Sequence, residues 1–147
     1  MKINHQESRD SFLAKFNHCY DGVVRAIQMN FSPSKTFGSS LVTLSVCSGT
    51  KKKRDEWVNL RLSITDVEEF SLRENSRESC RVLSGGLQIG LFGELLFFDF
   101  APYSVCPTGM EDYRRSGFYV AGRSFSWRVE AYSEQVKTTG RKKLLHS

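Results

Sequence analysis

The chain has 147 residues, which suits one domain able to bury about two-thirds of the surface that its unfolded form exposes. Its apolar runs are short, which excludes a membrane-spanning helix of roughly 20 residues, and the opening MKINHQESRD lacks the apolar segment of a secretory signal. We therefore expect a cytoplasmic protein with a single globular domain, residues 1–136, followed by a basic tail, residues 137–147.

The net charge of +5 is concentrated in two places. Lys51, Lys52, Lys53 and Arg54 carry four positive charges in an expected loop, and the tail carries four more with no acidic residue. Removing these two groups of four from +5 leaves −3 for the remainder. The folded body is therefore expected to be slightly acidic, which weakens the argument from net charge for a nucleic-acid partner.

The first expected element is a short amphipathic helix over residues 6–16, where Phe12, Leu13 and Phe16 recur at helical spacing. A turn dipeptide, Asp21–Gly22, follows it. Beyond this turn, apolar and polar residues alternate in most segments, as in half-buried strands, because successive side chains of a strand point to opposite faces. The expected strands are residues 22–31, 40–47, 56–64, a short strand within 65–74 after a bend, 87–92, 94–100, 117–121 and 123–132.

The last of these segments, RSFSWRVEAY, shows the cleanest alternation in the chain. It places Phe125, Trp127 and Val129 on one face, which predicts the last core strand of an antiparallel sheet. The strand over 94–100 is apolar on both faces apart from Asp99, so we expect it to be covered on both sides, by the N-terminal helix on one of them.

These elements together predict an α+β fold. It would have one mostly antiparallel, curved sheet or partial barrel of about seven strands, with the single N-terminal helix against one face.

Catalytic chemistry has little support in the sequence. His18 could act as a base, because histidine titrates near neutral pH, but a turn residue bonded to backbone is the favoured interpretation. Asp99 in an apolar strand needs a partner, and neutralisation by Arg123 or Arg128 is favoured over a catalytic role. The sequence has no nucleophile motif and no phosphate-binding loop. We therefore expect no enzyme activity and no cofactor.

The four cysteines are spread almost evenly along the chain and lack the spacing of zinc ligands. Four free thiols and no metal site are expected, and whether the thiols converge in the fold is left open. The residues concerned are Cys19, Cys47, Cys80 and Cys106.

Five segments carry a resemblance to a known group of proteins: HCYDGVVRAIQM, WVNLRLSI, VEEFSLRE, LFFDF and SGFYVAGRSFSWRVEAY. Their order and strand spacing, from about Phe16 to Tyr132, resemble small bacterial proteins of unassigned function, some of which are candidate immunity proteins encoded beside polymorphic toxins. The resemblance implies a protein that binds and occludes a toxin, and it brings no catalytic residue.

An immunity role would require charge complementary to the partner. Many toxins that attack nucleic acid are basic, so acidic residues of the body are candidate contacts, as is the outward-facing Trp57. The candidate partner-binding residues are Trp57, Glu68, Glu69, Glu74, Glu78, Glu111 and Asp112.

Two functions therefore remain from the sequence. The first is a non-enzymatic cytosolic protein-binding module, with the immunity role that the resemblance implies. The alternative is a nucleic-acid-binding accessory protein that uses Lys51 to Arg54 and the tail, although no strand alternates outward aromatics with basic residues as RNA-binding sheets do. No membrane partner is expected, and the oligomeric state is left open.

Overall fold

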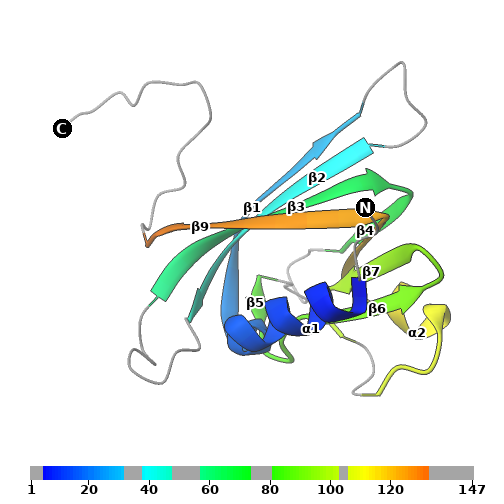
Figure 1. The fold of residues 1–147 in the computed structure, drawn as a ribbon, viewed down its shortest axis with the longest axis horizontal. Helices are drawn as coiled ribbons and strands as arrows, with labels where there is room; N and C mark the ends of the chain where they lie inside the picture. Colours follow the sequence, from blue (N-terminus) through cyan, green and yellow to red (C-terminus); the bar gives the residue numbers. More distant parts are fainter. Residues whose placement is uncertain (1–4, 32–37, 48–56, 74–80, 103–105, 133–147) are drawn as a thin grey trace.

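The computed structural model describes residues 5–31, 38–47, 57–73, 81–102 and 106–132, which form nine strands, two α-helices and one short 3-10 helix (Figure 1). The strands make two antiparallel sheets. Sheet A has the order β5-β1-β2-β3-β9, and sheet B has the order β4-β8-β7-β6. The bounds are α1 His5–Lys15, η1 Asn17–Cys19, β1 Gly22–Asn30, β2 Gly38–Cys47, β3 Trp57–Val67, β4 Glu69–Leu72, β5 Val82–Leu83, β6 Gln88–Phe92, β7 Leu95–Asp99, α2 Met110–Arg114, β8 Phe118–Gly122 and β9 Ser124–Ala131.

The antiparallel architecture and the N-terminal helix are confirmed, but the single curved sheet or partial barrel is wrong. The chain crosses between the two sheets at one shared corner, where two neighbouring pairs of strands meet. β3 bends at Asp66, whose φ is +52°, and continues as β4, while β8 passes into β9 after Gly122. Because both strands turn at the same place, the chain forms two stacked sheets joined at one corner.

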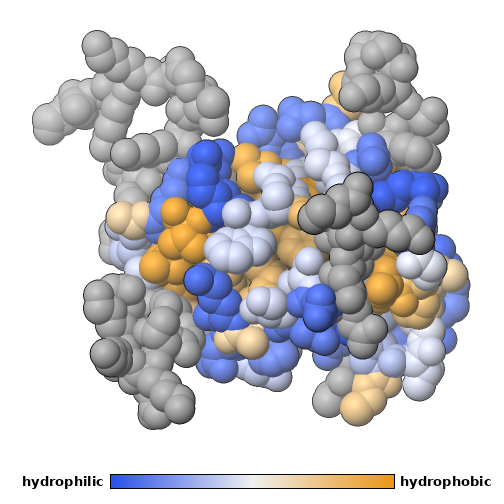
Figure 2. Space-filling view, viewed as in Figure 1, coloured by the Kyte–Doolittle hydropathy of each residue, from blue (hydrophilic) through white to orange (hydrophobic). Residues whose placement is uncertain are grey.

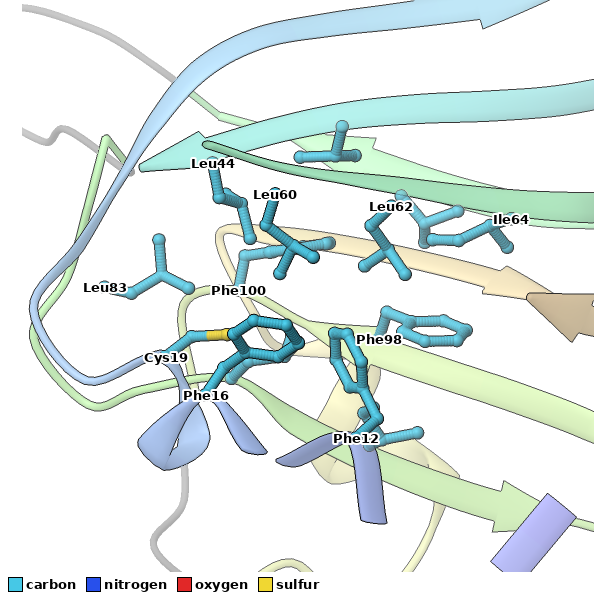
Figure 3. Close-up of a cluster of buried hydrophobic side chains, with 14 of the residues drawn as sticks. Phe12, Phe16, Cys19, Leu44, Leu60, Leu62, Ile64, Leu83, Phe98 and Phe100 are labelled. Atoms are coloured by element: carbon cyan, nitrogen blue, oxygen red, sulfur yellow. The ribbon is translucent and has the colours of Figure 1, made fainter. Parts of the chain in front are cut away.

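The main core lies between the two sheets (Figure 3). The inward residues of β2 and β3 supply aliphatic side chains, and sheet B and its flanks supply both phenylalanines and aliphatic side chains. The alternation predicted from the sequence is therefore confirmed for these strands. The most deeply buried members include Leu44, Leu60, Leu62, Ile64, Phe98, Phe100, Phe118 and Val120.

α1 lies between the sheets' margins and does not cover a sheet face, contrary to the expectation. Its Phe12 and the following Phe16, just beyond the end of the helix, are buried in the core, and the Phe12 ring lies 5.6 Å from that of Phe125 on β9. The outer face of sheet B is covered instead by α2, whose Tyr113 packs on Phe97 and directly over Gly90. A Cβ at Gly90 would lie 2.5 Å from the Tyr113 ring, so glycine is needed there for this contact.

The segment RSFSWRVEAY forms β9, and its inward parity is as predicted, but it is the edge strand of sheet A and not a core strand. Phe125 is partly buried against the core, whereas Trp127 and Val129 remain 38% and 39% exposed. An edge strand has a neighbour on one side only, so its apolar face is covered less completely.

Neither helix of the described residues has the length and apolar character needed to cross a membrane.

Candidate functional site

The outer face of sheet A, which points away from the core, carries a connected set of polar side chains. Arg25 on β1 donates through Nε to Ser45 Oγ on β2 at 2.8 Å, and Ser45 Oγ donates to Asn59 Oδ1 on β3 at 2.7 Å. The other end of the Arg25 guanidinium donates through Nη2 to the hydroxyl of Tyr132 at 3.2 Å. Ser45 and Asn59 are buried, so these bonds fix polar groups that could not be left unsatisfied.

Three arginines and one glutamate determine the charge of this outer face. Arg61 and Arg128 stand opposite each other in the β3–β9 ladder, and both approach Glu130 Oε2, at 3.6 Å and 3.3 Å. Arg61 is held largely buried, whereas the Arg128 side chain is 68% exposed. With Arg25, the described residues of this face carry three positive charges against one negative charge. We call Arg25, Trp57, Arg61, Arg128, Glu130 and Tyr132 the basic face.

Two aromatic side chains stand at one end of the basic face. Trp57 is 41% exposed and Tyr132 is 42% exposed. Val58 pairs with Ala131, so the residues that precede and follow this pair, Trp57 and Tyr132, come opposite each other across the sheet. The Arg25 guanidinium lies 6.0 Å from the Tyr132 ring. Trp57 is thus placed where the sequence predicted, on the polar side of its strand.

Both basic segments of the sequence leave sheet A at this same end. The connection that contains Lys51, Lys52, Lys53 and Arg54 runs from Cys47 to Trp57, which pair with each other at the end of the β2–β3 ladder. The tail begins after Tyr132, beside Trp57. The basic segments themselves lie outside the described residues.

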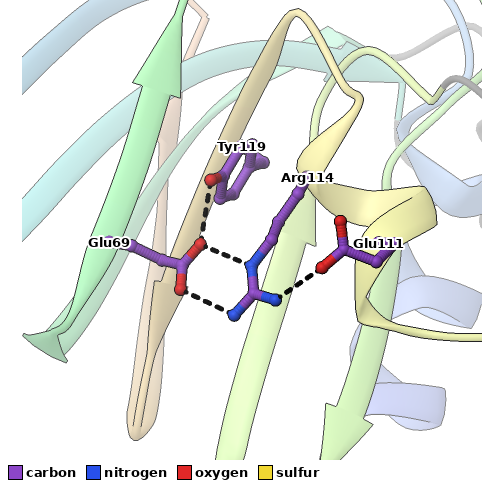
Figure 4. Close-up of polar contacts among 4 residues, drawn as sticks. All are labelled: Glu69, Glu111, Arg114 and Tyr119. Atoms are coloured by element: carbon purple, nitrogen blue, oxygen red, sulfur yellow. Dashed lines mark hydrogen bonds and ion pairs between the residues drawn. The ribbon is translucent and has the colours of Figure 1, made fainter.

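The acidic candidates lie elsewhere, around β4 and α2, and each one described is engaged within the chain; Figure 4 shows Glu69 and Glu111 with their partners. The Arg114 guanidinium makes two bonds to the Glu69 carboxylate, at 3.0 and 3.1 Å, and one of 2.9 Å to Glu111. The hydroxyl of Tyr119 donates to the same Glu69 carboxylate at 2.9 Å. The bond from Arg114 holds the pKa of Glu69 below its usual range, and burial, with Glu69 beside it, raises the pKa of Tyr119 to about 12.

Of the remaining acidic candidates, two form an ion pair or hydrogen bonds and two lie outside the described residues. Glu68 pairs with Arg123 at 2.6 Å. Asp112 accepts hydrogen bonds from the backbone and side chain of Thr108, and the backbone bond lowers its pKa. Glu74 and Glu78 lie outside the described residues.

Asp99 is buried on the outer side of β7, and the expected neutralisation by Arg123 or Arg128 is wrong. Its carboxylate accepts from the backbone N–H of Ala101 at 3.1 Å and is bonded to Ser116. Arg123 instead pairs with Glu68, and Arg128 projects from the other sheet. Burial without a nearby cation raises the pKa of Asp99 to about 6, while the two hydrogen bonds oppose that shift.

A cavity of about 310 Å³ lies between α1, η1 and the start of β6. His18 lines it from a turn in which Asn17, His18 and Cys19 all have positive φ, and the His18 carbonyl accepts from the backbone N–H of Leu87. The carboxylate that lines the cavity, that of Asp10, is bonded to Arg9 at 3.2 Å. Asp99 does not line this cavity, so the two residues considered for acid–base chemistry do not share a site. The other lining residues are Leu13, Tyr20, Gly85, Leu87, Gln88, Ile89, Pro107 and Tyr113.

No disulfide joins the described cysteines, Cys19, Cys47 and Cys106. Burial raises the pKa of Cys19 to about 12, which makes its thiol unreactive. Within the described residues there is also no group of three histidine, cysteine or carboxylate side chains that could hold a metal ion. Cys80 lies outside them.

Sequence reasoning identified Trp57 and Arg128 as outward residues but missed Arg25, Arg61 and Tyr132 as their neighbours. Arg61 and Tyr132 have the outward parity of their segments, which the alternation does indicate. Arg25 has the parity of the inward Ile27 and Met29, and it faces outward at the bulge between Val24 and Ala26. Their proximity depends on the pairing of β1, β2, β3 and β9, which the alternation does not fix.

No protein-family model, curated protein or solved structure matches this chain.

Proposed function

We propose that this chain is a non-enzymatic protein-binding module that uses the basic face of sheet A to bind an acidic surface of a partner protein. The observation that carries the proposal is that Trp57, Tyr132 and Arg128 are displayed together on one hydrogen-bonded sheet. Tryptophan, tyrosine and arginine are the residues that most often dominate the energy of protein interfaces.

The rigidity of this face supports the proposal. Arg25 and Arg61 are fixed by bonds to Ser45, Tyr132 and Glu130, so little side-chain freedom would be lost when a partner binds. The excess of positive charge would speed the encounter with an acidic partner and would make it sensitive to salt. An immunity protein acts by covering its toxin, so this face would suit a toxin with an acidic surface and not the basic toxins for which the acidic residues were considered. That narrower role rests on the resemblance of the strand pattern.

The test is capture of partners from the native cell with the tagged full-length chain, followed by mass spectrometry. We expect one protein to be recovered with the wild type and lost with both Trp57→Ala and Arg128→Glu. Phe31→Ala is the matched control, because Phe31 is a 70% exposed aromatic that lies outside the basic face, and it should retain the partner. A partner that survives both substitutions, or none recovered at all, would contradict the proposal.

If the partner is a toxin, a more specific result is expected. Co-expression of the chain with a toxin encoded beside it should restore growth, and Trp57→Ala should abolish the rescue while Phe31→Ala keeps it. Failure to rescue, with partner capture intact, would remove the immunity role and leave the protein-binding module.

Nucleic-acid binding is the second candidate, and one observation favours it. The chain segments that carry the two groups of four positive charges both leave sheet A at the end where Trp57 and Tyr132 lie. Binding of a fluorescent single-stranded oligonucleotide should then weaken steeply with salt. Replacing Lys51, Lys52, Lys53 and Arg54 with glutamine should reduce the salt slope, and an unchanged slope would exclude the loop.

A further inference from the structure

β9 has one edge that no strand of the described residues pairs with. The β3–β9 ladder runs without a bulge from the Thr65–Ser124 pair to the Val58–Ala131 pair, and β9 contains no proline. At the other margin of sheet A, β1 is partly covered by β5 and has a bulge between Val24 and Ala26. Bulges and prolines are two of the devices that protect an exposed edge. The β9 edge lacks both, so it is regular enough to pair with another strand.

We propose that β9 pairs with β9 of a second copy of this chain, antiparallel and around a two-fold axis at Val129, so that two five-stranded sheets become one continuous sheet. Such an interface is closed, because the same strand is used by both copies. The contact is made along the free edge of β9 and shares Arg128 and Glu130 with the basic face, but it does not depend on the partner proposed above, whose capture is also tested with Trp57→Ala.

The charges on the strand are self-complementary about Val129. Arg128 and Glu130 flank this residue on the outward face. In an antiparallel pair centred on Val129, Arg128 of each copy stands opposite the partner's Glu130, so two opposite-charge pairs form at once. Charge pairs directly opposite each other across strands are stabilising, by roughly 0.2–1 kcal/mol each.

The neighbouring arrangements are less favourable. An axis at Arg128 or at Glu130 would place like charges directly opposite each other, which is destabilising. An axis at Trp127 would place Arg128 opposite a serine and form no charge pair. An axis between two residues would set the apolar face of one strand against the polar face of the other. The charge pattern therefore selects one register.

The apolar face of β9 fits the same register. Val129 would meet the partner's Val129, and Trp127 would meet the partner's Ala131, which would cover side chains that are 39% and 38% exposed in one copy. Trp127 is held in place by the Phe16 ring at 5.2 Å and by the Lys15 ammonium at 5.5 Å from its ring. In Figure 2 hydrophobic surface is visible over the C-terminal end of β9, at the left of the view.

A cysteine placed on the axis tests the register directly. Opposed Cα atoms in an antiparallel pair are about 4.5–5.5 Å apart, within the range of a disulfide. In a full-length chain with Cys47, Cys80 and Cys106 replaced by serine, Val129→Cys should form a covalent dimer under mild oxidation. Ser126→Cys is the matched control, because its two thiols would be about 20 Å apart and should not crosslink.

Charge reversal gives a second, independent readout by sedimentation equilibrium. Arg128→Glu alone and Glu130→Arg alone should each weaken the dimer by about tenfold or more, because attraction becomes repulsion at both pairs. The double variant should return to within about threefold of the wild type, since the pairs are re-formed with reversed sign. Glu111→Arg, an exposed reversal on α2 at the outer face of sheet B, should leave the dimer unchanged.

The outcomes divide cleanly. A wild type that stays monomeric at millimolar concentration, a Ser126→Cys dimer in place of the Val129→Cys dimer, or a double variant no better than the single ones would overturn the proposal. A monomer whose β9 amides become protected only when a foreign extended peptide is added would assign the edge to that peptide instead. Circular dichroism of each variant confirms that the fold is retained.

Discussion

Asp99 is a carboxyl group in a place where ionisation is unfavourable. It is 2% exposed, and burial raises its pKa from 3.8 to about 6. The folded protein therefore holds this proton more tightly than the unfolded chain does. The stability that results is fully present below about pH 3.8 and is lost as the pH rises to about 6.

Asp99→Asn should remove this pH dependence. Asparagine keeps an oxygen to accept from the Ala101 N–H and offers an amide to Ser116, much as the protonated carboxyl does. We expect the variant to be more stable than the wild type at pH 8 by about 2 kcal/mol, and to be close to it at pH 4. Urea denaturation at pH 4, 6 and 8 measures the difference.

A suitable control for this substitution is Asp112→Asn. The pKa of Asp112 is lowered by its bond from the Thr108 backbone, so its ionised form is the stabilising one and the difference should have the opposite sign. A less stable Asp99→Asn variant at pH 8 would mean that a cation stabilises the ionised Asp99 carboxylate.

The sequence identified Asp99 as unusual but not its partners. One acidic residue inside LLFFDF is a clear signal, because a buried carboxylate is costly. Its nearest bonds come from Ala101, two residues along, and from Ser116 on the approach to β8. The alternation of the strands gives no indication of the bond to Ser116. The two arginines considered as partners, Arg123 and Arg128, pair with Glu68 and Glu130 instead.

Among the elements, the corner between the sheets depends on close backbone contact at Gly122. A Cβ there would lie 2.6 Å from Ile64 Cγ2 and 2.7 Å from the Thr65 carbonyl oxygen, and backbone cannot move aside easily. The alternation of apolar and polar residues predicts which face of a strand is buried. It does not predict where the chain passes from one sheet to the other, as it does between β3 and β4 at this corner.

Gly122→Ala should therefore lower the free energy of unfolding by about 2–3 kcal/mol, because the added methyl would force the two strands apart at the corner. Gly109→Ala provides the comparison, since no atom lies within 4 Å of its Cβ position, and it should cost less than about 1 kcal/mol. Thermal or urea unfolding of the two variants distinguishes them, and equal effects would show that the corner can relax.

Element positions were largely predictable, and their arrangement was not. The alternation in residues 40–47 and 56–64 fits β2 and β3 closely, because both have one buried face. β5 was missed because two residues are too short to show a period. The split into two sheets was missed because it depends on Gly122 meeting Ile64, a contact between residues far apart in the sequence.

For the molecule as a whole, α1 is what joins the margins of the two sheets. Phe12 contacts Phe16, which follows the last residue of α1, and Phe125 and Trp127 on β9, and α1 also borders β6 of sheet B. One side of the core is thus closed by a helix that belongs to neither sheet. The sheets should therefore unfold together, and the stability of the fold should depend on α1.

Phe12→Ala tests this dependence. Removing a buried phenylalanine leaves a cavity and should lower the free energy of unfolding by about 3–5 kcal/mol. Urea unfolding followed by far-ultraviolet circular dichroism and by tryptophan fluorescence should give one coincident transition, because Trp127 reports on the margin that α1 covers. Phe31→Ala, at a 70% exposed ring, should change stability by less than about 0.5 kcal/mol. Two separated transitions in the Phe12 variant would instead mean that each sheet is stable without the helix.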